Sequence, residues 1–79
     1  MNIEVAAFAT LRRYMNNLAL GSSRIIEVEP GTTLGQIRDI LGLPEEEVAI
    51  IMHNHRHAEL GDVPVDGDRV VYIPPVGGG

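Results

Sequence analysis

The sequence predicts an α+β domain in which one main helix packs across a mixed sheet of four to five strands. Four segments of strand length are rich in apolar residues, at 2–9, 24–29, 48–52 and 69–73. Two stretches with helical spacing separate the first three of these segments. Seventy-nine residues with 44% hydrophobic content are enough for one domain with one core. Such a core leaves little volume for a deep active site.

The first strand, expected over residues 2–9, is mostly apolar and suits a buried position. A short helix is expected after it, because Leu11, Met15 and Leu18 recur at spacings of four and three residues. Gly21 follows and is interpreted as a glycine cap that closes this helix. The apolar period therefore changes from that of a strand to that of a helix near the end of the first segment.

The second strand is expected over residues 24–29, where apolar and polar residues alternate. Ile26 and Val28 should face inward, and the two glutamates beside them should face solvent. Pro30-Gly31 then ends the strand with the pair that a type II turn favours. This segment is therefore expected to lie half exposed and to pair antiparallel with the first strand.

The main helix is expected over residues 33–41. Thr33 and Gln36 have the spacing of a capping box, in which each side chain binds the backbone N–H of the other. Gly42 follows the last apolar residue and indicates the helix end. The helix is expected to cross over to a parallel third strand.

The third strand is expected in the continuous apolar run at 48–52, which indicates a strand covered on both faces in the middle of a sheet. Polar and glycine-containing turns are expected at 53–57, 60–62 and 65–68. The last strand, at 69–73, is rich in residues that favour β structure. Pro74 and Pro75 end it, because proline has no N–H for the ladder.

The composition excludes several function classes. The chain has no cysteine, which excludes disulfides, thiolate metal sites and a cysteine nucleophile. Its formal charge of −5 disfavours binding to nucleic acid. No signal peptide and no membrane-spanning stretch is expected, so the sequence predicts a cytoplasmic protein without a membrane partner. No phosphate loop, serine nucleophile motif or catalytic triad is found.

Three stretches of the chain carry a resemblance to a known family: FATLRRY near the start, EPGTTLGQIRDILGLPEEEV in the middle and VDGDRVVYIPPVGGG at the end. The last is the most specific, because an Asp-Gly-Asp turn, one strand, a Pro-Pro-Val stop and terminal glycines follow in that order. Together they resemble the MoaD/ThiS sulfur-carrier family, closest to the small subunit of molybdopterin synthase. The resemblance implies a ubiquitin-like β-grasp fold.

Two positions depart from the family pattern. The hairpin tip often reads Val-Asn-Gly in the family and here reads His53-Asn54-His55, so a turn glycine is lost. Asn54 is expected to compensate by accepting a left-handed conformation. The position before Pro74 is often phenylalanine and here is Ile73, which reduces an apolar contact with a partner. Both departures concern the branch within the family.

The resemblance implies that the terminal carboxylate is the reacting group. Gly79 would be adenylated with AMP from ATP, would become a thiocarboxylate, and would then donate sulfur. Gly77 and Gly78 would thread into a partner's active site, since glycine makes a narrow extended chain. The same interpretation divides the chain into a β-grasp domain at 1–74 and a flexible tail at 75–79.

In this interpretation the chain is a carrier and not itself an enzyme. An E1-like adenylyltransferase/sulfurase would supply ATP and its metal, and this chain would bind no cofactor or metal of its own. The large subunit of molybdopterin synthase would be the second partner. The residues expected to contact partners are Pro74, Pro75, Val76, Ile73 and Leu60.

Several alternatives remain open at the level of sequence. The carrier could serve thiamine synthesis, tRNA thiolation, cysteine synthesis or protein conjugation, or the chain could be a β-grasp adaptor with an inert tail. All six basic residues are arginine, which fits either genome composition or a need to avoid amines beside an activated carboxylate. His53, His55 and His57 alternate, and a solvated turn is favoured over a metal site because strand spacing keeps the outer two too far apart.

Overall fold

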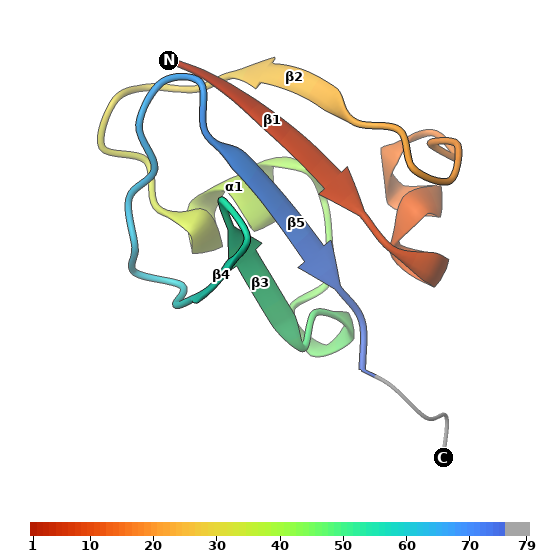
Figure 1. Cartoon of the computed structure of the whole chain (residues 1–79). Coiled ribbons are helices and arrows are strands. Elements are labelled where there is room, and N and C mark those ends of the chain that lie inside the picture. Colours follow the sequence, from red (N-terminus) through yellow and green to blue (C-terminus); the bar gives the residue numbers. More distant parts are fainter. Residues whose placement is uncertain (76–79) are drawn as a thin grey trace.

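Residues 1–75, the part of the chain that the computed structural model describes, form one five-stranded mixed sheet with a single α-helix on one face (Figure 1). The strands are β1 (Asn2–Ala7), β2 (Arg24–Glu27), β3 (Ile50–His53), β4 (Arg56–Ala58) and β5 (Arg69–Ile73). The helices are α1 (Leu34–Ile40) and two 3-10 helices, η1 (Ala9–Met15) and η2 (Glu45–Glu47). The predicted α+β class, with one main helix and a short helix after the first strand, is confirmed.

The strand order is β2-β1-β5-β3-β4. β1 and β5 are parallel, and every other neighbouring pair is antiparallel. The first two strands therefore pair antiparallel, as expected. β2 and β3 run in the same direction, so α1 does connect two parallel strands, but β1 and β5 lie between them.

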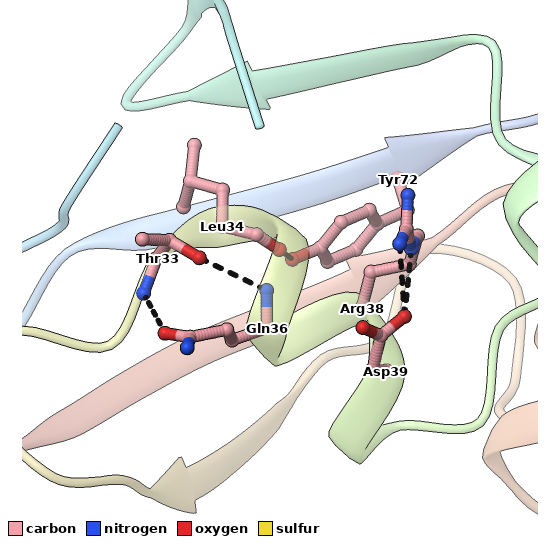
Figure 2. Close-up of polar contacts among 6 residues, drawn as sticks. All are labelled: Thr33, Leu34, Gln36, Arg38, Asp39 and Tyr72. Carbon is pink, nitrogen blue, oxygen red and sulfur yellow. Dashed lines mark hydrogen bonds and ion pairs between the residues drawn. The ribbon is translucent and has the colours of Figure 1, made fainter. Parts of the chain in front are cut away.

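Local capping signals define both ends of α1. The Thr33 hydroxyl accepts a hydrogen bond from the Gln36 backbone N–H at 3.1 Å, and the Gln36 side chain accepts one from the Thr33 N–H at 2.9 Å (Figure 2). At the other end, the Gly42 N–H donates to Asp39 and the Leu43 N–H donates to Arg38, the pairing of a Schellman motif. Gly42 has φ +77°, which favours glycine. Both predicted helix ends are thus confirmed to within a residue.

The core lies between α1 and one face of the sheet. In β5, Val70 and Tyr72 point toward α1 and are fully buried. The Tyr72 hydroxyl donates to the Leu34 carbonyl at 2.7 Å, which ties the sheet to the first turn of α1 (Figure 2). The other buried apolar residues are Ile3, Val5, Ala6, Ala7, Leu11, Met15, Val28, Leu34, Ile37, Leu43 and Ile51.

The third strand differs from its prediction. β3 is neither central nor covered on both faces: it lies second from the edge, and of its four described residues Ile51 alone is buried. The reason is that α1 covers one face, whereas Ile50 and Met52 lie on the open face. The apolar run therefore places apolar side chains on the open face, where α1 does not cover them.

The expected glycine cap of the short helix is also wrong. η1 ends at Met15, and Asn16 takes the left-handed conformation at φ 57° that Gly21 was expected to provide. Asparagine tolerates this conformation better than most residues because its short side chain can bind locally. Gly21, at φ +80°, belongs to a later turn.

Candidate functional site

The tail leaves the domain at the end of β5. The Ile73 carbonyl accepts a hydrogen bond from the Ala49 N–H at 2.8 Å. Pro74 and Pro75 then provide no N–H, so the ladder stops as predicted; Pro74 is half-buried and Pro75 is exposed. Because β1 is parallel to β5, the exit lies at the same end of the sheet as η1 (Figure 1).

The four terminal residues of the predicted site lie outside the described residues. These are Val76, Gly77, Gly78 and Gly79. The expected reacting carboxylate, the threading glycines and the expected flexibility of the tail therefore stay predictions. The boundary between the domain and the tail, placed after Pro74, stays a prediction for the same reason.

Ile73 borders an apolar hollow on the open face of the sheet. The hollow has a volume of about 390 Å³ and is lined by Phe8, Met52, Val71 and Ile73, with His55 and Arg69 at its polar rim. Met52 and Val71 are cross-strand partners, which fixes them side by side. The structure thus brings the predicted partner residue Ile73 together with apolar residues that the sequence had not singled out.

Phe8 is the residue that the sequence placed least well. It was expected in a buried strand, but β1 ends at Ala7, and the Phe8 side chain is 47% exposed. Its N–H donates to the Tyr72 carbonyl at 3.0 Å, which fixes it beside the end of β5. The sequence did contain a signal for an apolar open face. Every residue from 70 to 73 is apolar or aromatic, whereas a strand with one face in solvent would alternate apolar and polar residues.

Leu60 lies apart from this hollow. Its carbonyl accepts a hydrogen bond from the Gly35 N–H at 2.9 Å, and a Cβ added at Gly35 would lie 3.3 Å from the Leu60 Cβ. A side chain at position 35 would therefore require Leu60 to shift by a few tenths of an ångström. Leu60 thus packs on the first turn of α1, on the side of the sheet that carries the helix. It remains accessible there, because 45% of its surface is exposed.

Charged side chains flank the open face and the tail exit in pairs. On the open face, Glu4 accepts hydrogen bonds from the Ser23 hydroxyl at 2.6 Å and from Arg69 at 3.0 Å. Near the tail exit, the Tyr14 hydroxyl donates to Glu47 at 2.6 Å and thereby joins η1 to η2. The charge of Glu4 is balanced by Arg69, which lines the hollow, and that of Glu47 by Arg13 at 3.5 Å.

The three alternating histidines do not form one group. Asn54 and His55 make the turn between β3 and β4, both with positive φ, at 50° and 70°, which is typical of a two-residue type I′ hairpin. The expected left-handed Asn54 is confirmed, whereas the polar turn expected at 53–57 is shorter, because His53 and His57 belong to strands. Among residues 1–75 no three or more of the histidines and carboxylates lie together in a way that could hold a metal ion.

His53 binds Asp68, which precedes β5. Its Nε2 lies 2.6 Å from the Asp68 Oδ2, and the same carboxylate accepts hydrogen bonds from the Val65 N–H and the Asn54 amide, each at 2.9 Å. These bonds, first of all the one with His53, lower the pKa of Asp68 to about 2. Asp68 thus serves to join the hairpin to the turn before β5.

Comparison with known proteins identifies the family. The sequence model of the ThiS family matches residues 4–79. The chain belongs to the ThiS family. The match includes the strand β5, the two prolines and the three glycines, which is the segment that carried the resemblance. No curated protein sequence matches this ThiS-family chain.

Several solved structures are similar to it. The Haloferax volcanii HVO 2177 protein is 25% identical with a TM-score of 0.78, over 100% of this chain and 87% of that one. Subunit 1 and 2 of molybdopterin-converting factor from Helicobacter pylori form a complex; the matching chain is 26% identical with a TM-score of 0.63 over 100% of both chains. SAMP1 from Haloferax volcanii is 22% identical with a TM-score of 0.75 over 100% of both chains and shows the fold alone.

These similarities confirm the predicted resemblance to MoaD/ThiS sulfur carriers and the ubiquitin-like β-grasp fold. The family consists of small carrier proteins that act within complexes, which is consistent with a chain that needs a partner. No helix within residues 1–75 is long and apolar enough to cross a bilayer.

Proposed function

We propose that the chain is a sulfur carrier in which the Gly79 carboxylate is adenylated, converted to a thiocarboxylate and used to donate sulfur. The ThiS-family match through residue 79 is the observation that carries this proposal. The chain itself is not the catalyst in this scheme. An E1-like adenylyltransferase/sulfurase supplies ATP, its metal ion and the catalytic groups.

The chemistry needs an activated acyl group. A carboxylate oxygen of Gly79 attacks the α-phosphate of ATP, pyrophosphate leaves, and an acyl-adenylate forms. Hydrosulfide from a sulfur donor then attacks the acyl carbon, AMP leaves with the oxygen, and the thioacid that forms loses its proton. The product carries sulfur in place of one carboxylate oxygen. No side chain of this protein takes part, which agrees with the absence of cysteine.

The arrangement around β5 supports a carrier that docks through its open face. Ile73 and Val71 point into the apolar hollow, and Pro74-Pro75 follows directly. A partner that covers the hollow therefore also receives the start of the tail. Proline restricts the chain to extended conformations, so a stiff Pro74-Pro75 segment beside the hollow suits delivery of the reacting terminus to a partner's site.

We further propose that the acceptor complex is a molybdopterin synthase and that its large subunit covers the open face. The Helicobacter pylori protein, which is found in a complex of subunits 1 and 2 of molybdopterin-converting factor, supports this choice. Thiamine synthesis, tRNA thiolation, cysteine synthesis and protein conjugation are the other destinations for the sulfur.

The decisive experiment measures intact mass. The chain is incubated with its activating enzyme, ATP and a sulfur donor, and we expect a mass increase equal to the replacement of one oxygen by sulfur. Fragmentation should place the change at Gly79. An unchanged mass with an activating enzyme that is competent on another carrier would contradict the proposal and favour an adaptor with an inert tail.

A second experiment separates the tail from the fold. Deletion of Gly79, or addition of one residue after it, should abolish sulfur loading and leave thermal unfolding unaltered. Val71→Asp should weaken docking because it places a charge in the apolar hollow, whereas Val65→Ser, at an exposed position outside the hollow, is the matched control. Equal binding of the large synthase subunit by both substituted chains would contradict docking through the open face.

A further inference from the structure

The edge strand β2 has a free outer edge. Met1 and Val28 exchange both backbone hydrogen bonds, at 2.6 and 2.9 Å, so bonded pairs recur at every second residue of the β1–β2 ladder. Ile25 and Glu27 fall between these pairs, and their N–H and C=O groups point away from β1. Within residues 1–75 no hydrogen bond to these four groups is present.

Apolar side chains lie on both sides of this edge. Ile25 is 70% exposed on the open face of the sheet. On the helix side, a hollow of about 640 Å³ separates the end of β2 from the end of α1, and Val28, Thr32 and Ile40 line it. Ile40 is 62% exposed. An extended chain placed along β2 would direct alternate side chains toward Ile25 and into this hollow.

The charge along the edge indicates the kind of partner. Glu27 and Glu29 form the rim of the hollow, and within residues 1–75 neither has an ion-pair partner. Met1 lines the hollow as well and its ammonium donates to the Val28 carbonyl, so two carboxylates are set against one cation there. A second copy of the chain would bring the same carboxylates and another net charge of −5, which opposes pairing of two β2 edges. An extended segment with basic and apolar residues in alternation fits both the charge and the side-chain pattern.

We propose that β2 and the hollow beside α1 bind a basic, extended segment of a partner protein by addition of a strand to the sheet. Ile25 and Glu27 supply the backbone hydrogen bonds, Val28 and Ile40 contact the apolar side chains, and Glu27 and Glu29 bind the basic ones. This surface lies at the edge opposite to β4 and is separate from the hollow beside Ile73. Both surfaces are therefore available at the same time.

The test uses a synthetic peptide, acetyl-Arg-Val-Arg-Val-Arg-amide, titrated into the isotope-labelled full chain. We expect chemical-shift changes centred on the amides of Ile25 and Glu27, and protection of these two amides from hydrogen exchange. Binding should weaken with added salt, and acetyl-Glu-Val-Glu-Val-Glu-amide should not bind. No binding at millimolar peptide, or shift changes centred on Met52 and Val71, would overturn the proposal.

Substitutions at Glu27 separate backbone from charge. Glu27→Pro removes an outward N–H that the sheet does not use, and it should weaken binding about tenfold more than Glu27→Gln, which removes the charge alone. Ile40→Ser tests the hollow without changing the strand and should also weaken binding. Thermal unfolding shows whether each variant is folded. Folded variants that all bind the peptide with the affinity of the wild type would contradict strand addition. Concentration-dependent dimers that Glu27→Pro abolishes would instead assign the edge to a second copy.

Discussion

Replacement of Asp68 by asparagine tests how the hairpin and the last strand are joined. The Asp68 carboxylate binds His53, Asn54 and the Val65 N–H at once, and its pKa is lowered from 3.8 to about 2. Asp68→Asn keeps one acceptor oxygen but removes the charge and replaces the other oxygen with a donor. We therefore expect the variant to fold with lower stability.

The magnitude follows from the pKa of Asp68. A group whose pKa is lower in the folded state stabilises that state above its unfolded pKa, by about 1.4 kcal/mol per pKa unit. The fall from 3.8 to about 2 thus sets an upper limit somewhat above 2 kcal/mol. Asp68 lies at the rim of the sheet, where solvent screens its interactions, so we expect about 1 kcal/mol. This corresponds to a decrease in Tm of about 4–8 °C.

Urea unfolding of both proteins between pH 6 and pH 2 provides the assay. The stability advantage of the wild type over Asp68→Asn should be complete above the unfolded pKa of 3.8 and should disappear as the pH falls through the folded pKa of about 2. Glu46→Gln is the matched control, because Glu46 is exposed and no hydrogen bond of its side chain is present in residues 1–75. A difference between wild type and Asp68→Asn that is independent of pH would refute the role of the charge.

Three further predictions concern local structure, and each is checked by urea or thermal unfolding at neutral pH. Thr33→Ala should lower the free energy of unfolding by about 1 kcal/mol, since the Gln36 N–H loses its cap, and an unchanged stability would show that the capping box contributes nothing. Tyr72→Phe should lower it by about 0.5–1.5 kcal/mol through loss of the bond to Leu34, and a stable variant would mean that this buried bond is not net favourable. His55→Gly should raise it by about 0.5 kcal/mol, because glycine adopts φ 70° without strain; a decrease would indicate that the imidazole has stabilising contacts that outweigh the strain.

The parts of the fold that the sequence predicted best depend on neighbouring residues. The ends of α1 follow from Thr33, Gln36 and Gly42, whose effects act within one helical turn. The alternation of the second strand likewise placed Ile26 and Val28 inward, and both pack in or against the core. Helix caps and strand alternation involve residues only a few positions apart, so a short stretch of sequence is enough to predict them.

The parts that it missed depend on the arrangement of distant segments. Whether β3 is covered on one face or two depends on where α1 lies, and the apolar run at 48–52 is the same in either case. Phe8 became part of the hollow beside Ile73 because β1 and β5 pair from opposite ends of the chain. A window around residue 8 contains no information about residue 73, so this part of the candidate site needed the structure.

The pairing of β1 with β5 has a consequence for synthesis and quality control. The centre of the sheet joins residues 2–7 to residues 69–73, so an N-terminal fragment that lacks β5 has no central strand and leaves β2-β1 and β3-β4 as separate hairpins. Isolated two-stranded units are at best marginally stable in water. Folding must therefore await emergence of the last strand from the ribosome, and prematurely terminated chains should remain unfolded and open to proteases. In this topology, a folded domain reports that synthesis has reached the segment from which the tail extends.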